Sequence, residues 1–414
     1  MRTMWRRACG LTVAPLVMAS AVACGGGSDQ ASEGTTLRVI VNITPNLTEK
    51  YWNDLFDGYE KAHPGVTIKL ELTGTISPDA KLRQDLAAGD PPDVAQQITP
   101  KADNVSLFTD LSDQPWIKKT PLTAQYAVGG KHYVAGVGEQ IQSLVFYNKA
   151  AFAKAGVDAA RITTMAQFTS AMGELKDAGY KPLQTAGQWV TGAQFSMIAD
   201  AGVLTADPEW SAKRNQGKAS FAESGYLPYF DHYKSWIDDG YLEKSALGLT
   251  YADGQTAFLN GKSAMYVMGS FFVPAADAAK KSDDIGVFTM PTDGAYPSGQ
   301  FGNISNPYVV VNKSRHKAEA IEFVKWATTD AAAIKSQLAS DGNLREGFTY
   351  PMSSLGTSVQ QILDKAPSVL VKSGESEPIT GFSDELNKQI QSLYTGASPE
   401  DAADGLDKWW NSQS

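Results

Sequence analysis

An alternation of strand and helix patterns over residues 37–94 constrains the fold more than any other feature of the sequence. Residues 37–41 form a short apolar run, residues 66–72 alternate apolar and polar side chains, and Val94 opens a third strand pattern. Between the second and third strand patterns, Ser77 is placed to cap a helix whose first residue is Pro78. Between the first and second strand patterns, apolar residues recur at i, i+3, i+4 and i+7, which predicts one apolar face of a helix. These residues are Trp52, Leu55, Phe56 and Tyr59. Such an alternation predicts an α/β fold with a mostly parallel sheet and helices on both faces.

A second pattern, over residues 133–156, indicates a junction between two lobes. Small residues lead into a polar segment, and residues 144–147 then form an apolar, aromatic run typical of a buried strand. Asn148 is placed to cap the helix that follows. The polar segment carries Glu139, Gln140 and Gln142. A ligand groove needs backbone that allows close approach and a few polar groups on a firm support, although an ordinary loop before an ordinary strand has the same pattern.

The beginning of the chain predicts export. Arginines at positions 2, 6 and 7 precede an apolar stretch of 12 residues, 11–22, which is too short to span a bilayer as a helix. The following small residues end at Cys24, and the whole resembles a bacterial lipoprotein signal, with Ala21 where leucine is usual. We therefore expect a signal peptide at residues 1–23, a flexible tether at 24–36, and a lipid anchor on Cys24 at the extracellular face of the membrane. Cleavage without lipidation is the alternative.

Cysteine usage and charge narrow the class of protein further. The chain has two cysteines, Cys9 and Cys24, so the exported domain is expected to fold without a disulfide. Residues 37–414 are long enough to bury a large core in two lobes. The net charge of −9 and the absence of an arginine cluster argue against nucleic acid as a partner.

Motifs for catalysis are weak. The acidic pairs Asp238-Asp239 and Asp283-Asp284 are adjacent in sequence, so their side chains point apart and do not form the carboxylate pair of a glycosidase. The histidines lack metal-ligand spacing, and no nucleophile elbow or phosphate-binding loop is present. These histidines are His63, His132, His232 and His316. The sequence therefore predicts a protein that is not an enzyme and that needs no metal or other cofactor.

Six stretches, in this order, resemble the extracellular solute-binding proteins of ABC importers, specifically the sugar-binding family that includes maltose-binding protein. They are residues 56–66 (FDGYEKAHPGV), 89–94 (GDPPDV), 144–156 (LVFYNKAAFAKAG), 257–270 (AFLNGKSAM with a following Gly-Ser), 285–291 (IGVFTMP) and 317–329. Each stretch alone is a weak signal. Together they span about 300 residues of the chain in the order that the family has.

The resemblance implies two discontinuous α/β lobes joined by crossover strands, the type II arrangement of periplasmic binding proteins. The expected lobes are 37–139 with 290–329, and 140–289 with 330–414. The chain would cross near residues 138–142, return near 289–293, and cross again around the end of the helix that starts at Lys317. The resemblance also implies a monomer that closes on a sugar or oligosaccharide and delivers it to an ABC permease in the membrane.

Candidate ligand contacts follow from the same resemblance and from sugar chemistry. A sugar offers hydroxyls around its rim and weakly polar faces, so it favours amides, carboxylates and guanidinium groups beside it and aromatic rings beneath it. The candidates are Asn42, Asn46, Gln96, Gln97, Glu139, Gln140, Trp189, Phe271, Gly302, Asn303, Arg345 and Phe382. The alternative for each aromatic ring is core packing, and for each amide a solvated loop. Glu139 is the leading candidate.

Two other functions stay open at this point. A binding protein for a non-sugar solute is one, although a cation would favour several carboxylates and a phosphate would favour arginines, whereas these loops are rich in Asn and Gln. A secreted glycan hydrolase is the other. The sequence also departs from the family, with 136–138 (GVG) where a proline is usual and Phe271 where tryptophan is common.

Overall fold

The strand and helix alternation near the start of the chain builds the five-stranded sheet of the first lobe. Its strand order is β2-β1-β3-β11-β4. The strands are β1 (Thr35–Val41), β2 (Val66–Leu72), β3 (Val94–Gln96), β4 (Val134–Ala135) and β11 (Tyr308–Val310). β1 is parallel to β2 and β3, but β11 is antiparallel to both β3 and β4. The predicted parallel arrangement is therefore confirmed for the first three strands, and the first of them begins two residues earlier than expected.

The computed structural model describes residues 34–74, 76–207, 209–223, 225–292, 301–365, 369–370 and 379–413. The predicted signal peptide, Cys9, Cys24 and most of the predicted tether lie outside the described residues. Gly34–Ser414 form one compact unit. Within the described part of the chain, no helix combines the length and the hydropathy that a membrane crossing requires.

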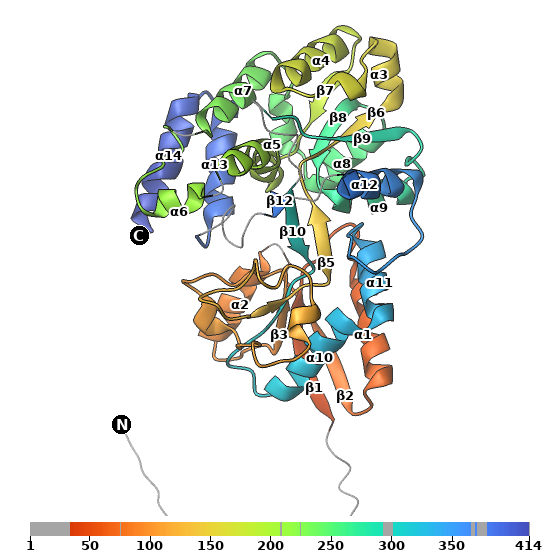
Figure 1. Cartoon of the computed structure of the whole chain (residues 1–414), viewed down its shortest axis with the longest axis vertical. Helices are drawn as coiled ribbons and strands as arrows, with labels where there is room; N and C mark the ends of the chain where they lie inside the picture. Colours follow the sequence, from red (N-terminus) through yellow and green to blue (C-terminus); the bar gives the residue numbers. More distant parts are fainter. Residues whose placement is uncertain are drawn as a thin grey trace, which may run out of the picture. The chain divides into compact units, whose positions relative to one another are not determined.

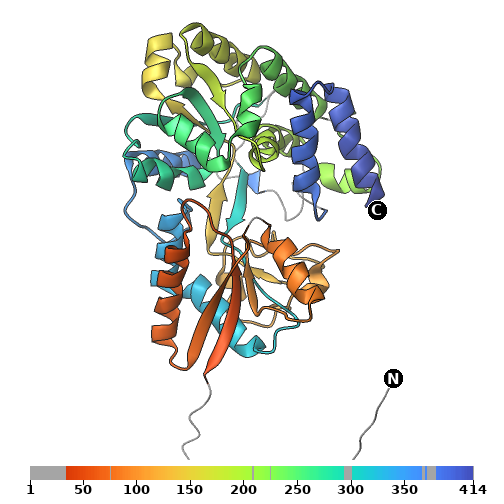
Figure 2. The same ribbon diagram turned by 180° about the vertical axis from the view of Figure 1, so that it is seen from behind.

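Helices cover both faces of the first sheet (Figure 2). They are α1 (Glu49–Ala62), α2 (Pro78–Ala87), α10 (Lys317–Thr329) and α11 (Ala331–Ser340), with the 3₁₀ turns η1 (Val105–Leu107) and η2 (Ile117–Lys119). The predicted apolar face of α1 is confirmed, because Trp52, Leu55, Phe56 and Tyr59 are its buried residues. They pack in one core with β1, α10 and α11. A second, smaller core under α2 contains Ile40, Leu82 and Val309.

A four-stranded sheet of order β7-β8-β6-β9 organises the second lobe. Its strands are β6 (Leu144–Asn148), β7 (Lys181–Gln184), β8 (Ser263–Met268) and β9 (Ile285–Thr289). β6 is the predicted buried strand at 144–147, and Asn148 caps the following helix as predicted, accepting from the Ala151 amide. β6 is antiparallel to both neighbours, so this sheet is mixed.

The second lobe is rich in helices (Figure 1). They are α3 (Lys149–Ala155), α4 (Met165–Asp177), α5 (Val190–Ala206), α6 (Trp210–Asn215), α7 (Leu227–Asp238), α8 (Tyr251–Leu259), α9 (Val273–Ala278), α12 (Ser354–Lys365), α13 (Phe382–Tyr394) and α14 (Pro399–Ser412), with 3₁₀ turns η3 (Ala159–Arg161), η4 (Lys244–Gly248) and η5 (Ser270–Phe272). Two cores hold them to the sheet, one beneath α4, α5, α7, α13 and α14 and one beneath α8, α9 and α12.

A narrow ribbon of order β12-β10-β5 joins the lobes (Figure 1). Its strands are β5 (Gly138–Ile141), β10 (Phe301–Ser305) and β12 (Val369–Leu370). β5 lies within the stretch 138–142 where the first crossing is predicted. Gly138 suits this position, because a β-carbon there would come within 2.6 Å of the Leu344 carbonyl oxygen.

The other two crossings differ from the prediction. The chain returns through β10, which pairs with β5, and not at 289–293; Met290, on the predicted return, is buried in the second lobe's larger core. The third crossing follows α11, where Leu344 bridges to Glu139, and not α10. Ala333, Ile334 and Leu338 of α11 pack in the first lobe's core, which explains why the chain does not leave that lobe at residue 330.

Candidate functional site

A cleft of about 480 Å³ opens where the two lobes meet the ribbon. The carboxyl end of β3, the strands β5 and β10, the start of α5 and the end of α11 all contribute side chains to it. Its described lining residues are Gln97, Thr99, Lys101, Tyr126, Gln140, Trp189, Asn303, Ile304, Ser305, Asn306, Pro307 and Asp341. Ligands of open α/β sheets bind outside the carboxyl ends of strands, and this cleft has that position for β3.

The pairing of β5 with β10 sets which side chains face the cleft. Gln140 lies opposite Asn303 in this antiparallel pair, so the two amides point to the same face. Glu139, the leading candidate from the sequence, points to the other face. There its carboxylate lies over Gly302, because a β-carbon added to Gly302 would come within 2.0 Å of Oε1. The strand therefore brings Gln140 into the cleft, whereas Glu139 is not among the lining residues.

Trp189 supplies an aromatic wall on the second lobe. It is 45% exposed, which is unusual for so large an apolar ring, and it immediately precedes α5. The ring of Tyr251 packs against it with centroids 4.9 Å apart and an interplanar angle of 49°. Its neighbour Gln188 is held by bonds from the Tyr251 amide (2.9 Å) and the Gln391 amide group (3.1 Å). The exposed ring is therefore fixed in place rather than loose.

Asp341, at the end of α11, is the buried carboxylate of the cleft, and the sequence prediction missed it. Its oxygens accept from Asn46 (3.2 Å), Gln140 (3.3 Å) and Asn343 (3.2 Å). Burial raises the pKa of Asp341 to about 6, although those three amide donors act in the opposite direction. An Asp-Gly pair after a helix is a common turn signal, so nothing in the sequence distinguishes Asp341 from an ordinary helix end.

Tyr126 was also missed, and its hydroxyl lies on β10. It accepts from the Ile304 backbone amide at 3.1 Å and donates to the Asn303 side-chain oxygen at 3.4 Å. Burial raises the pKa of Tyr126 to about 12, so the phenol is neutral at neutral pH. It orients Asn303 toward the cleft.

Four of the predicted contacts, Gln97, Gln140, Trp189 and Asn303, line the cleft. Three others reach it through a neighbour. Asn42 donates to Gln97 (3.0 Å), Gln96 donates to Asn306 (3.2 Å), and Asn46 donates to Asp341 and to the Phe271 carbonyl oxygen (2.7 Å). The last bond joins the β1–α1 loop of the first lobe to η5 of the second.

The remaining candidates bond to backbone groups or pack in the interior of the protein. Arg345 donates to the carbonyl oxygens of Val137 (3.0 Å), Thr328 (2.9 Å) and Lys119 (2.8 Å), so its guanidinium group is occupied by backbone. Phe382 is 5% exposed and packs between Phe221 and Trp410. Phe271 is half-buried, and its ring packs against the second lobe's cores. Gly302 is buried in β10 beneath Glu139.

Three of the six described non-glycine residues with positive φ lie at or beside the cleft. Gln97 (φ 61°), Gln188 (φ 56°) and Asn306 (φ 42°) adopt left-handed conformations that residues other than glycine rarely take. Two of these residues line the cleft and the third adjoins Trp189. Such residues cost about 1–3 kcal/mol each and cluster at functional sites.

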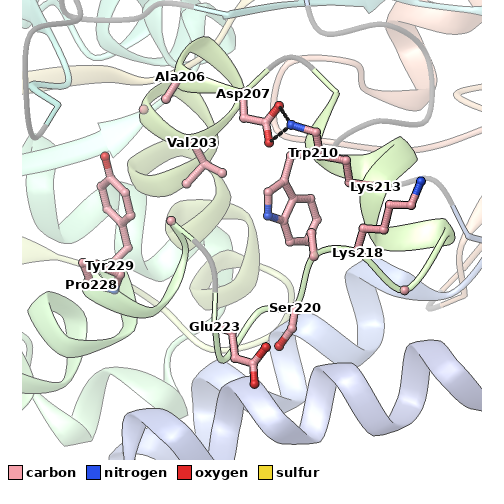
Figure 3. Close-up of a pocket in the computed structure, with 14 residues that line it drawn as sticks. Val203, Ala206, Asp207, Trp210, Lys213, Lys218, Ser220, Glu223, Pro228 and Tyr229 are labelled. Carbon is pink, nitrogen blue, oxygen red and sulfur yellow. Dashed lines mark hydrogen bonds and ion pairs between the residues drawn. The ribbon is translucent and has the colours of Figure 1, made fainter.

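A second cavity of about 610 Å³ lies in the second lobe, between the end of α5, α6 and the start of α7 (Figure 3). Trp210, Tyr229 and Val203 form its buried side. At its rim, both carboxylate oxygens of Asp207 accept from Lys213, at 2.7 and 2.8 Å. None of the predicted contacts lines it, and it involves one lobe only, so lobe closure would not act on it.

The described lining of the cleft contains one carboxylate. Glycoside hydrolysis uses two carboxyl groups facing each other. Asp341 is the one carboxylate among the described lining residues, and among the described residues no group of His, Cys, Asp and Glu is arranged to hold a metal ion.

Comparisons with known proteins agree with this geometry. Residues 44–334 match the family model described as bacterial extracellular solute-binding protein. A multiple sugar-binding protein of Streptococcus mutans is 24% identical over 316 residues, covering 72% of this chain and 73% of that protein. A solved chitin oligosaccharide binding protein superimposes with a TM-score of 0.80 at 22% identity, covering 92% of this chain and 99% of the other. A sugar transporter component from Bacillus licheniformis, solved with stachyose, has a TM-score of 0.73 at 19% identity, with coverages of 92% and 100%.

Proposed function

The chain belongs to the bacterial extracellular solute-binding protein family, and from that premise we propose that it binds a neutral oligosaccharide between its lobes and delivers it to an ABC import permease. The observation that carries the proposal is the composition of the cleft. An exposed, supported tryptophan of the second lobe faces a cavity lined mostly by uncharged amide and hydroxyl groups from the first lobe and the ribbon.

Sugar chemistry fits these groups. The weakly polar C–H face of a pyranose stacks on an aromatic ring such as Trp189, and the hydroxyls around its edge exchange hydrogen bonds with amides that both donate and accept. Gln97, Gln140 and Asn303 are such amides. The similar proteins solved with stachyose or named for chitin oligosaccharides support this ligand class.

Delivery requires that ligand binding change the position of the lobes. A ligand that contacts both lobes binds the closed state better than the open one and so shifts the equilibrium toward closure. The cleft's lining includes Gln97 on the first lobe and Trp189 on the second, and β5, β10 and the segment at Leu344 form the waist about which the lobes would move.

The protein would act at the extracellular face of the cell membrane. Cys24 is the proposed lipidation site after removal of residues 1–23, and the tether that follows would leave the monomeric binding domain free to meet the permease. For the lobes, the packing of α11 favours 35–137 with 306–340 as the first and 142–292 with 345–413 as the second.

Two alternatives make different predictions. A glycan hydrolase would need a second carboxylate opposite Asp341, and the described lining residues supply none. A carrier of a cationic solute would need several carboxylates around Trp189, and a carrier of an anion would need more cations than Lys101.

The direct test is isothermal titration calorimetry of the purified protein with raffinose, stachyose, N,N′-diacetylchitobiose, xylotriose and maltotriose. Saturable binding of at least one sugar, with chromatography showing the sugar intact after incubation, supports the proposal. Release of shorter sugars would identify an enzyme. Binding of a polyamine or a phosphate ester with no response to any sugar would reject the sugar as the ligand class.

A further inference from the structure

Three neighbouring residues at the edge of the cleft carry polar atoms that have no hydrogen-bond partner among the described residues. They are Oε1 of Gln96, Oγ of Ser305 and Nδ2 of Asn306. All three residues are at most 4% exposed, and Ser305 and Asn306 line the cleft. Buried polar groups are nearly always paired, so a group of unpaired ones beside a cavity calls for a partner other than the described part of the chain.

Asn306 is held in a fixed orientation. Its φ of 42° lies in the left-handed region, which asparagine tolerates better than most residues. Its side-chain oxygen accepts from Nε2 of Gln96 at 3.2 Å, and the backbone amide of Gln97 donates to the carbonyl oxygen of Pro307 at 2.9 Å. These two bonds clamp the turn after β10 against the end of β3.

The bond from Gln96 determines which side-chain atom of Asn306 is available to a ligand. Because Oδ1 is engaged by Gln96, the amide presents its Nδ2 hydrogens as unused donors. Flipping the amide would place Nδ2 against the Gln96 donor, so the bond also selects the orientation.

We propose that Asn306 is a ligand-contacting residue that donates from Nδ2 to a hydroxyl or ring oxygen of the sugar, and that Gln96 is the positioning residue that aims it. This inference rests on the proposed function and makes it more specific. The contact requires an acceptor oxygen on the ligand, because the Nδ2 group can donate but not accept. Gln96, a candidate contact from the sequence, then acts through Asn306 and does not touch the sugar.

A sugar that lacks the acceptor oxygen should bind more weakly. A site built to hydrogen-bond one oxygen rejects an analogue that lacks it, since the buried donor is left unpaired. Ser305, whose hydroxyl can donate or accept, completes the same subsite.

Three variants test the two roles. Asn306→Gly keeps the left-handed backbone and removes the amide. Asn306→Asp keeps the side-chain shape and the acceptor for Gln96 but removes the donor. Gln96→Met removes the bond that aims Asn306, with little change in volume. Gln255→Met is the matched control, because Gln255 is 6% exposed, also has an unpaired Oε1, and does not line the cleft.

Calorimetry with the same five sugars gives the readout. For each sugar that the wild-type protein binds, we expect Kd to rise about tenfold or more in both Asn306 variants and by a smaller factor in Gln96→Met, with no change in Gln255→Met. In the double variant Gln96→Met, Asn306→Gly, the Gln96 effect should vanish, because a positioning residue has nothing left to position.

The outcomes separate this inference from the function it rests on. If the wild-type protein binds none of the sugars, the proposed function fails. If it binds a sugar and both Asn306 variants bind it equally well, the function stands and the subsite is wrong; an internal water then pairs with Nδ2. If the Gln96 and Asn306 effects are additive, Gln96 is not the positioning residue.

Discussion

At the scale of single residues, Trp189 is the side chain that we propose as the stacking surface for the ligand. Exposure of its ring to water is unfavourable in the sugar-free protein. The exposed ring offers a surface on which a sugar face can stack. We predict that Trp189→Ala raises Kd for the bound sugar about tenfold or more, measured by calorimetry. Trp189→Phe, which keeps a smaller ring, should lose less. Equal affinity in the alanine variant would place the ligand elsewhere.

Asp200, buried in α5, makes stability depend on pH. It is 3% exposed and accepts from the Tyr226 hydroxyl at 2.9 Å. Burial raises the pKa of Asp200 to about 7, although the hydrogen bonds act in the opposite direction. The folded protein therefore holds this proton over a range where the unfolded chain has released it. The resulting stabilisation is complete below about pH 3.8 and is lost as the pH rises through about 7.

We predict that Asp200→Asn removes this dependence. The free energy of unfolding of the variant should increase relative to that of the wild-type protein as the pH rises from 4 to 7. At pH 8 the variant should be more stable by on the order of 1–3 kcal/mol. Urea unfolding at a series of pH values measures the difference. Because Asp341 also titrates near pH 6, the relevant quantity is the difference between the two profiles, not the slope of either. A difference that is constant with pH would contradict the prediction.

At the scale of elements, the pleat of β5 separates two neighbouring candidates. Gln140 faces the cleft beside Asn303, whereas Glu139 lies over Gly302 on the other face. We predict that Gln140→Ala weakens sugar binding by about fivefold to tenfold and more than Glu139→Ala does, as measured by calorimetry. A greater loss in Glu139→Ala would restore the carboxylate as the leading contact and would imply that the ribbon moves on binding.

At the scale of the whole molecule, Asn46 links the lobes. Its amide joins the Phe271 carbonyl oxygen of the second lobe to Asp341 at the waist, so separating the lobes must break the 2.7 Å bond. We predict that Asn46→Ala shifts the sugar-free protein toward the open state, increasing its radius of gyration in small-angle X-ray scattering, and weakens every bound sugar by a similar factor. Asn312→Ala is the control, since Asn312 is exposed, bonds within the first lobe to Ser106 and Lys317, and does not line the cleft. Loss of affinity for one sugar alone would make Asn46 a ligand contact.

The amino-acid sequence determined the local elements and the fold class. The helical spacing of Trp52, Leu55, Phe56 and Tyr59 and the cap at Asn148 depend on residues a few positions apart, so they could be predicted from the chain alone. Trp189 stood out for the same reason, as a large ring among small and polar neighbours.

The tertiary structure decided which polar groups meet. Asp341, Tyr126 and Asn306 reach the cleft through crossings and turns that pair residues some 200 positions apart, as in the bond from Gln96 to Asn306. The second crossing could not be located from the sequence, because a short strand rich in Gly, Asn and Ser has the composition of a loop until β5 pairs with it. Glu139 and Gln140 are adjacent and both polar in sequence, and only the register of that pairing places Gln140 beside Asn303 and Glu139 beside Ile304 and Gly302.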